Sequence, residues 1–112
     1  MEQQKYYRPL PDCLKIGDSE IEGNGLFAKE NISKGTCLGL SHVFNLGFID
    51  GYIRTPLGGF INYSDEPNCE TSDIREGQVY FDENKNLYIW TIRDLKKGDE
   101  LTLKYILYNP TI

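Results

Sequence analysis

The sequence predicts one mainly β domain with little helix. Its 112 residues suffice for one compact core, and 39% hydrophobic with 12% aromatic residues is the composition of a folded globular protein. Eleven glycines and five prolines interrupt the chain. The runs between them are short, and they either alternate between apolar and polar residues or consist of β-branched and aromatic residues.

The first part of the chain predicts three strands. Leu14–Ile16 and Leu26–Lys29 flank the turn "EGNG", in which Asn24 and Gly25 form the dipeptide that most readily adopts the positive φ values of a tight hairpin. A third strand is expected at Thr36–Phe44, after the glycine turn "SKG".

The middle of the chain is less regular. Asn45–Gly59 is rich in glycine, and one short helix is expected around Ile49. Strands follow at Glu70–Arg75, Val79–Phe81 and Leu87–Ile92, the last two joined by the polar turn "DENKN". Bulky side chains on both faces of this hairpin indicate that one face packs on the core while a neighbouring segment covers the other.

A strand closes the domain. It follows a turn at 97–99, and its alternation places Leu101, Leu103 and Tyr105 on one face. The first 13 residues, with two prolines, predict an extended arm.

Charge and composition exclude several classes of function. Twelve Lys and Arg against seventeen Asp and Glu give a net charge of −5, which argues against a nucleic-acid partner and favours a basic one. The chain has no apolar run of about 18 residues and no signal-peptide core, so no membrane partner is expected. We expect a cytoplasmic protein or, if the protein is viral, one in the interior or nucleus of the host cell.

The three cysteines predict free thiols. Cys13, Cys37 and Cys69 are an odd number and contain no Cys-x-x-Cys pair, which disfavours a disulfide framework or a four-ligand zinc site. No metal is expected.

Three short motifs each have an ordinary structural interpretation. "GNG" is a hairpin turn in most proteins, although glycines also let a backbone approach a neighbour closely. "FINYSDEPNCE" reads as a polar loop whose asparagines bond local backbone. Tyr105 in "ELTLKY" reads as a core aromatic, and the lone histidine, His42, as a packing or surface residue.

Taken together, in this order and spacing, the motifs resemble the successive signatures of the SET-domain lysine methyltransferases. The resemblance covers about residues 14 to 105. It implies a β-clip-like SET fold of small curled antiparallel sheets, in which the asparagine loop and the C-terminal strand cross in a pseudoknot. We accordingly assign an arm at 1–13, a SET domain at 14–108 and a tail at 109–112.

The resemblance also implies a cofactor and site residues. The cofactor is S-adenosylmethionine, converted to S-adenosylhomocysteine. Its binding residues would be Glu22, Gly23, Asn24, Gly25, Leu26, Asn62, Tyr63 and Asn68, with Asn68 also tying the chain crossing together. Tyr105 would be the catalytic residue, and Tyr52, Trp90 and Tyr108 would line the substrate channel.

Methyl transfer to lysine requires these residue types. The enzyme has to align an uncharged amine with the methyl carbon at a separation of about 3 to 3.5 Å. A lysine with a solution pKa of about 10.4 is an ammonium at neutral pH, and desolvation in an apolar channel lowers that pKa. A tyrosine hydroxyl orients the amine, and no metal is required.

Two features depart from the family pattern. Tyr63 stands where the family usually has histidine, and only "ILYNPTI" follows Tyr105 in place of a cysteine-rich closing segment. Either Tyr108 and Ile106 cover the cofactor, or another subunit of a homodimer supplies the missing wall.

The expected function is methyl transfer from S-adenosylmethionine to the lysine side chain of a basic protein or peptide. One alternative is a catalytically weak or inactive SET-like domain that binds a peptide or partner, an interpretation that Tyr63 favours. The other is an unrelated small β-barrel interaction protein with accidental motif matches.

Overall fold

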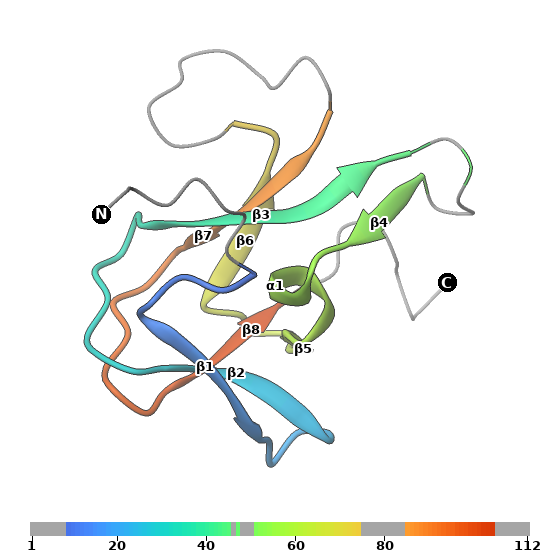
Figure 1. The fold of residues 1–112 in the computed structure, drawn as a ribbon. Coiled ribbons are helices and arrows are strands. Elements are labelled where there is room, and N and C mark those ends of the chain that lie inside the picture. Colours follow the sequence, from blue (N-terminus) through green and yellow to red (C-terminus); the bar gives the residue numbers. More distant parts are fainter. Residues whose placement is uncertain (1–8, 46, 48–50, 75–84, 105–112) are drawn as a thin grey trace, which may run out of the picture.

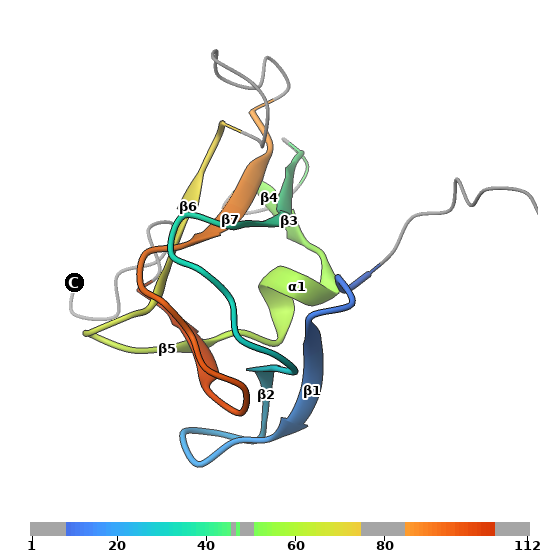
Figure 2. The ribbon, with the colours of Figure 1, turned by 90° about the vertical axis from the view of Figure 1, so that its left-hand side faces the viewer.

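A curled β-structure with one short helix is formed by the residues that the computed structural model describes, 9–45, 47, 51–74 and 85–104 (Figures 1 and 2). Its elements are β1 (Leu14–Asp18), β2 (Asn24–Ala28), β3 (Cys37–Phe44), β4 (Tyr52–Arg54), α1 (Pro56–Gly59), β5 (Asn62–Tyr63), β6 (Cys69–Ser72), β7 (Leu87–Thr91) and β8 (Glu100–Leu103). The prediction of a mainly β fold with little helix is confirmed.

Strand β8 is central to the arrangement. The strand order is β1-β2-β8-β6-β7-β3-β4, and β5 also pairs with β8. β8 runs antiparallel to β2 but parallel to β5 and β6. A strand from near the C-terminus therefore lies between the first hairpin and the segment that contains β5 and β6. This is the chain crossing that the resemblance implies.

The first hairpin has a different turn from the one predicted. Asn24 and Gly25 are paired residues of β2, opposite residues 17–18 of β1, so the prediction of positive φ values at this dipeptide is wrong. The turn covers residues 19–23, and its left-handed residue is Gly23, with φ of 48°. Ser19 closes this longer turn: its N–H donates to Gly23 O (2.8 Å), and its hydroxyl accepts from the backbone of the turn.

The irregular middle region contains the helix α1. Proline at the first helical position suits the helix start, and the Thr55 side chain caps it by accepting from Gly58 N. The same Thr55 hydroxyl donates to Leu40 O (2.8 Å), which fixes the helix against β3. The helix predicted around Ile49 falls on residues 48–50, outside the described residues.

The other predicted strands are present with shifted ends. β3 and β7 match their predictions within one residue, and β3 contains register shifts between Cys37 and Gly39 and between Leu40 and His42. β6 is shorter than the predicted 70–75. The predicted strand at 79–81 lies outside the described residues, as does most of the turn that follows it.

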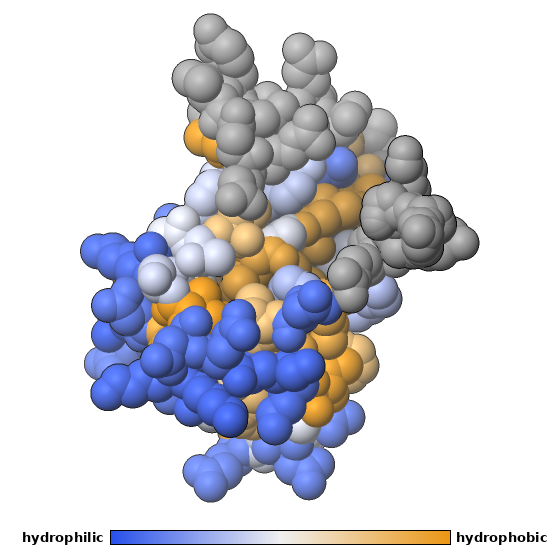
Figure 3. All heavy atoms as spheres, turned by 60° about the vertical axis from the view of Figure 1, so that its left-hand side comes forward, coloured by the Kyte–Doolittle hydropathy of each residue, from blue (hydrophilic) through white to orange (hydrophobic). Residues whose placement is uncertain are grey.

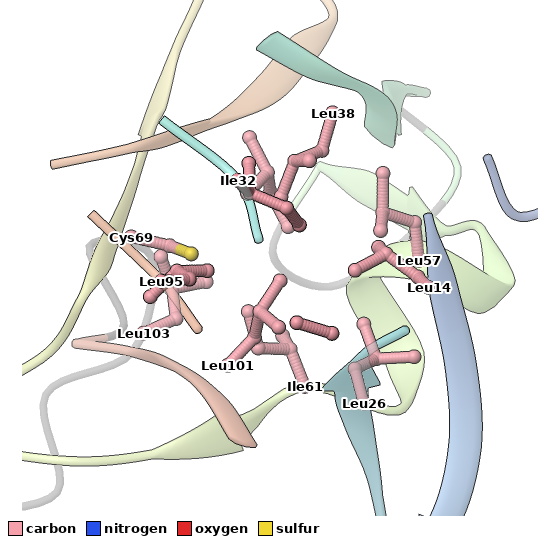
Figure 4. Packing of buried hydrophobic residues seen from close by; sticks show 12 residues of the cluster. Leu14, Leu26, Ile32, Leu38, Leu57, Ile61, Cys69, Leu95, Leu101 and Leu103 are labelled. Atoms are coloured by element: carbon pink, nitrogen blue, oxygen red, sulfur yellow. The ribbon is translucent and has the colours of Figure 1, made fainter. Parts of the chain in front are cut away.

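One hydrophobic core draws on nearly every element (Figure 4). Its buried residues are Leu14, Leu26, Ala28, Ile32, Leu38, Leu57, Ile61, Cys69, Ile89, Leu95, Leu101 and Leu103. Leu10 and Cys13 pack against this cluster, so this part of the predicted arm contacts the domain. His42 is 4% exposed and bonds Ser41 Oγ through Nδ1 (2.8 Å), which assigns it a packing role.

The surface is uneven in polarity. On the face shown in Figure 3, a group of hydrophobic residues lies next to a strongly hydrophilic region. Within the described part of the chain, no helix is long and apolar enough to cross a membrane.

Candidate functional site

Three segments that are distant in sequence meet beside Gly25. The segments are the turn between β1 and β2, β5 with Asn62, and the start of β8 with Glu100. Gly25 is buried, and a Cβ atom there would overlap Glu100 Oε2 and lie 3.1 Å from Asn62 Nδ2. A glycine is therefore needed at this position because two side chains of the same chain lie directly over its backbone.

Glu100 is held by two side chains. The Ser19 hydroxyl lies 2.9 Å from Oε1 and 2.8 Å from Oε2 of the Glu100 carboxylate, and Asn62 Nδ2 donates to Oε2 (2.9 Å). Hydrogen bonds to an ionised carboxylate are stronger than those between neutral groups. These bonds fix Glu100 beside the backbone of the first hairpin.

Asn62 Nδ2 faces more acceptors than it can satisfy. Besides the Glu100 carboxylate, it lies 3.0 Å from Ser19 Oγ, 3.1 Å from Glu22 O and 3.2 Å from Asn24 O. An amide nitrogen has only two hydrogens, so four acceptors share two donors. We call Ser19, Asn62, Glu100 and the carbonyls of Glu22 and Asn24 the acceptor cluster. It has spare acceptor capacity and one carboxylate, which suits a positively charged donor.

Asn68 joins the loop of the second motif to β8. Its Oδ1 accepts from Thr102 N (2.8 Å), and its Nδ2 donates to Glu100 O (2.9 Å). Its own backbone N–H donates to Thr102 Oγ1 (3.2 Å). Asn68 thus makes the contacts expected of a residue that ties the chain crossing, and it fixes the backbone of the residue that bears the carboxylate.

The remaining predicted cofactor residues of the hairpin have different environments. Glu22 and Gly23 are exposed on the turn and Asn24 is exposed at the start of β2; the carbonyls of Glu22 and Asn24 belong to the acceptor cluster. Leu26 is fully buried in the core opposite Leu101, so its side chain serves packing.

Tyr63 directs its hydroxyl into its own loop. The hydroxyl donates to Asp65 Oδ1 (2.5 Å), and this bond to a carboxylate, more than burial, raises the pKa of Tyr63 above its usual value. The backbone of Tyr63 pairs with Leu103 of β8. The residue in the usual histidine position is therefore anchored next to Asn62.

The predicted channel residues are spread over the fold. Tyr52 lies in β4, at the opposite end of the strand order from the first hairpin, with its ring edge-on to Phe44 and its pKa raised mainly by burial. Trp90 lies in β7 and lines a groove whose wall contains no residue of the acceptor cluster. Tyr105 and Tyr108 are outside the described residues.

Cys69 and Cys13 are poor nucleophiles at neutral pH. Burial raises the pKa of the Cys69 thiol to about 12, and burial also raises the pKa of Cys13. All three cysteines are free. Among the residues that the structure describes, no three His, Cys, Asp or Glu side chains group as metal ligands.

Two residues of the acceptor cluster were missing from the predicted site. Glu100 stands in the third motif, "ELTLKY", but its side chain had no assigned role. Ser19 follows β1 and carries no motif. Both act through contacts spanning 81 sequence positions, so only the strand order brings them together.

The chain contains a SET domain. A sequence profile of the SET domain family matches residues 39–106, which is more than half of the chain, and the chain belongs to this family. The family resemblance inferred from the three motifs is thereby confirmed.

Curated relatives carry histone-lysine methyltransferase names. The chain is 41% identical over 58 residues to the histone-lysine N-methyltransferase ASHH2 of Arabidopsis thaliana, covering 51% of this chain and 3% of that protein. It is 27% identical over 120 residues to a histone-lysine N-methyltransferase of Aspergillus oryzae described as specific for lysine 4 of histone H3, covering 82% of this chain and 9% of that protein. The chain thus spans less than a tenth of the length of either relative.

A solved structure shares the fold. The crystal structure of a Plasmodium falciparum protein, described as a candidate histone methyltransferase, superposes with a TM-score of 0.64 at 22% sequence identity. The match covers 85% of this chain and 94% of the other. It supports the SET architecture of the β-strands.

Proposed function

We propose that the chain transfers a methyl group from S-adenosylmethionine to the side-chain amine of lysine in a basic protein or peptide. The observation that carries this proposal is the acceptor cluster, in which four acceptors share the two hydrogens of Asn62 Nδ2. Family membership and the names of the relatives agree with the reaction class.

The cluster fits the methionine part of the cofactor. That part carries an α-ammonium group with three donors, and a positively charged sulfonium is close to it. The backbone carbonyls of Glu22 and Asn24 and the carboxylate of Glu100 are acceptors of the complementary kind. Gly25 keeps this region free of a further side chain. Tyr63 and the backbone of Asn62, which pair with β8, would provide the adjacent wall.

The chain's own residues position and desolvate the substrate. When bound, the cofactor supplies an activated methyl group. Tyr105 would orient the lysine amine through its hydroxyl, and an apolar channel would favour the uncharged amine. The net charge of −5 attracts a Lys/Arg-rich segment to the domain.

Replacement of Tyr105 by phenylalanine tests the assigned catalytic hydroxyl. We expect a loss of about 100-fold in methyl transfer, or a change in the number of methyl groups added, because only the hydroxyl is removed. Transfer of labelled methyl from S-adenosylmethionine to histones and basic peptides measures the rate, and mass spectrometry counts the methyl groups. Tyr6→Phe, in the predicted N-terminal arm, has no assigned role in the reaction. It is the matched control and should leave both quantities unchanged. An unchanged rate and product for Tyr105→Phe would remove Tyr105 from the mechanism.

A binding module without transfer is the second candidate function. It is favoured by Tyr63, whose hydroxyl is committed to Asp65 where the family usually has histidine. Cofactor binding by the wild type without turnover on any lysine substrate would establish this alternative.

A further inference from the structure

An open groove of about 410 Å³ lies along β6 and β7, which run side by side in Figures 1 and 2. Its lining includes the apolar residues Trp90, Ile74 and Ile92 and the charged residues Glu70 and Lys34. None of these residues belongs to the acceptor cluster. The groove is therefore a separate surface of the domain.

Trp90 and Glu70 form a pair inside the groove. They are direct cross-strand partners of β7 and β6, so their side chains are neighbours on the same face of the sheet. The indole N–H donates to Ile74 O (2.9 Å), which holds the ring and satisfies its only donor. The groove consequently presents an aromatic ring beside an exposed carboxylate.

We propose that this groove is a docking site for a lysine or arginine side chain of the basic substrate, separate from the lysine that is methylated. The charged group of such a side chain is attracted to the face of a tryptophan ring. The aliphatic part of the side chain covers apolar residues of the groove such as Ile74 and Ile92. Glu70 supplies the opposite charge. This inference rests on the proposed function, because the docked side chain belongs to the basic substrate of that reaction.

The charges around the groove set the expected direction of each variant. Glu70 attracts the bound cation, whereas Lys34, an exposed residue of the same lining, opposes it. The domain as a whole is acidic, with five more acidic than basic residues, seventeen against twelve. Removing Lys34 should therefore strengthen binding, and removing the Glu70 charge should weaken it.

Tryptophan fluorescence tests the docking site directly, because Trp90 is the only tryptophan of the chain. The probe is an arginine-rich peptide without lysine, which cannot accept a methyl group on lysine, titrated without S-adenosylmethionine. We expect a saturable change in Trp90 emission that weakens with added salt. Glu70→Gln should weaken binding about fivefold and Lys34→Ala should strengthen it about twofold.

Glu66→Gln is the matched control. Glu66 is an exposed acid outside the groove wall, and its replacement changes the net charge by the same amount. Affinity for the peptide should stay within about twofold of the wild type. Equal weakening by Glu66→Gln and Glu70→Gln would overturn the proposal in favour of nonspecific attraction.

Other occupants of the groove give different results. Trp90 emission that ignores the peptide but changes with protein concentration would assign the groove to a second copy of the chain and overturn the proposal. Trp90 emission that changes neither with the peptide nor with protein concentration, and that acrylamide quenches poorly, would show that the groove is already covered. This result would also overturn the proposal. The assay involves no methyl transfer. Its result therefore does not depend on whether the proposed catalytic function is correct.

Discussion

Gly25→Ala is expected to lower the free energy of unfolding by about 2 kcal/mol, the range for forcing atoms into a packed site. The new Cβ overlaps Glu100 Oε2, and the carboxylate cannot move aside without losing its bonds to Ser19 and Asn62. Gly25 does not have positive φ, so the effect is steric and not conformational. Urea unfolding followed by circular dichroism measures the change.

A second glycine and a double variant make this prediction specific. Gly59→Ala is the control, since a Cβ there has no neighbour within 4 Å, and it should shift stability by less than about 0.5 kcal/mol. In the double variant Gly25→Ala/Glu100→Ala the clash is absent. The double variant should therefore lose less unfolding free energy than the two single variants lose in sum. Strictly additive losses would show that Glu100 does not lie over Gly25.

Asn68→Ala is expected to destabilise the domain by about 3 kcal/mol. The truncation removes the acceptor for Thr102 N and the donor for Glu100 O, both at half-buried or buried positions of the central strand. An unsatisfied buried polar group costs about 1–3 kcal/mol, and two are created here. Thermal and urea unfolding of the variant measure the loss.

Asn31→Ala provides the comparison for Asn68. The Asn31 side chain also accepts from a backbone N–H, that of Lys97 (3.0 Å), but at an exposed position where water replaces the bond. A loss below about 1 kcal/mol is expected. If Asn68→Ala cost no more than Asn31→Ala, the chain crossing would not depend on Asn68.

Strand positions could be predicted from the sequence because local patterns specify them. β3 and β7 were predicted within one residue, since short runs rich in apolar residues and bounded by turn signals have few other interpretations. The hairpin turn was predicted wrongly at Asn24 and Gly25. There the side chain of Ser19 closes a longer turn, and a pairing of two glycines, Gly17 with Gly25, continues the strands.

Site residues could be predicted only where a motif carries them. The second motif singled out Asn62 and Asn68, and both bond across the chain crossing, while their cofactor role stays a prediction. Ser19 and Glu100 were missed because their contact spans 81 positions and depends on β8 lying next to β2. For Gly25, the sequence predicted that the backbone would lie close to a neighbouring group. The neighbours are Glu100 and Asn62, which the sequence alone could not specify.

Calorimetric titration with S-adenosylhomocysteine tests the central claim, that the acceptor cluster holds the α-ammonium group of the cofactor. We predict that the wild type binds, and that Glu100→Gln, which keeps the shape and removes the charge, weakens binding by about tenfold or more. Methylthioadenosine lacks the α-ammonium group, so its affinity should be the same for both proteins. Absence of binding by the wild type, or equal affinity of both proteins for S-adenosylhomocysteine, would contradict the account.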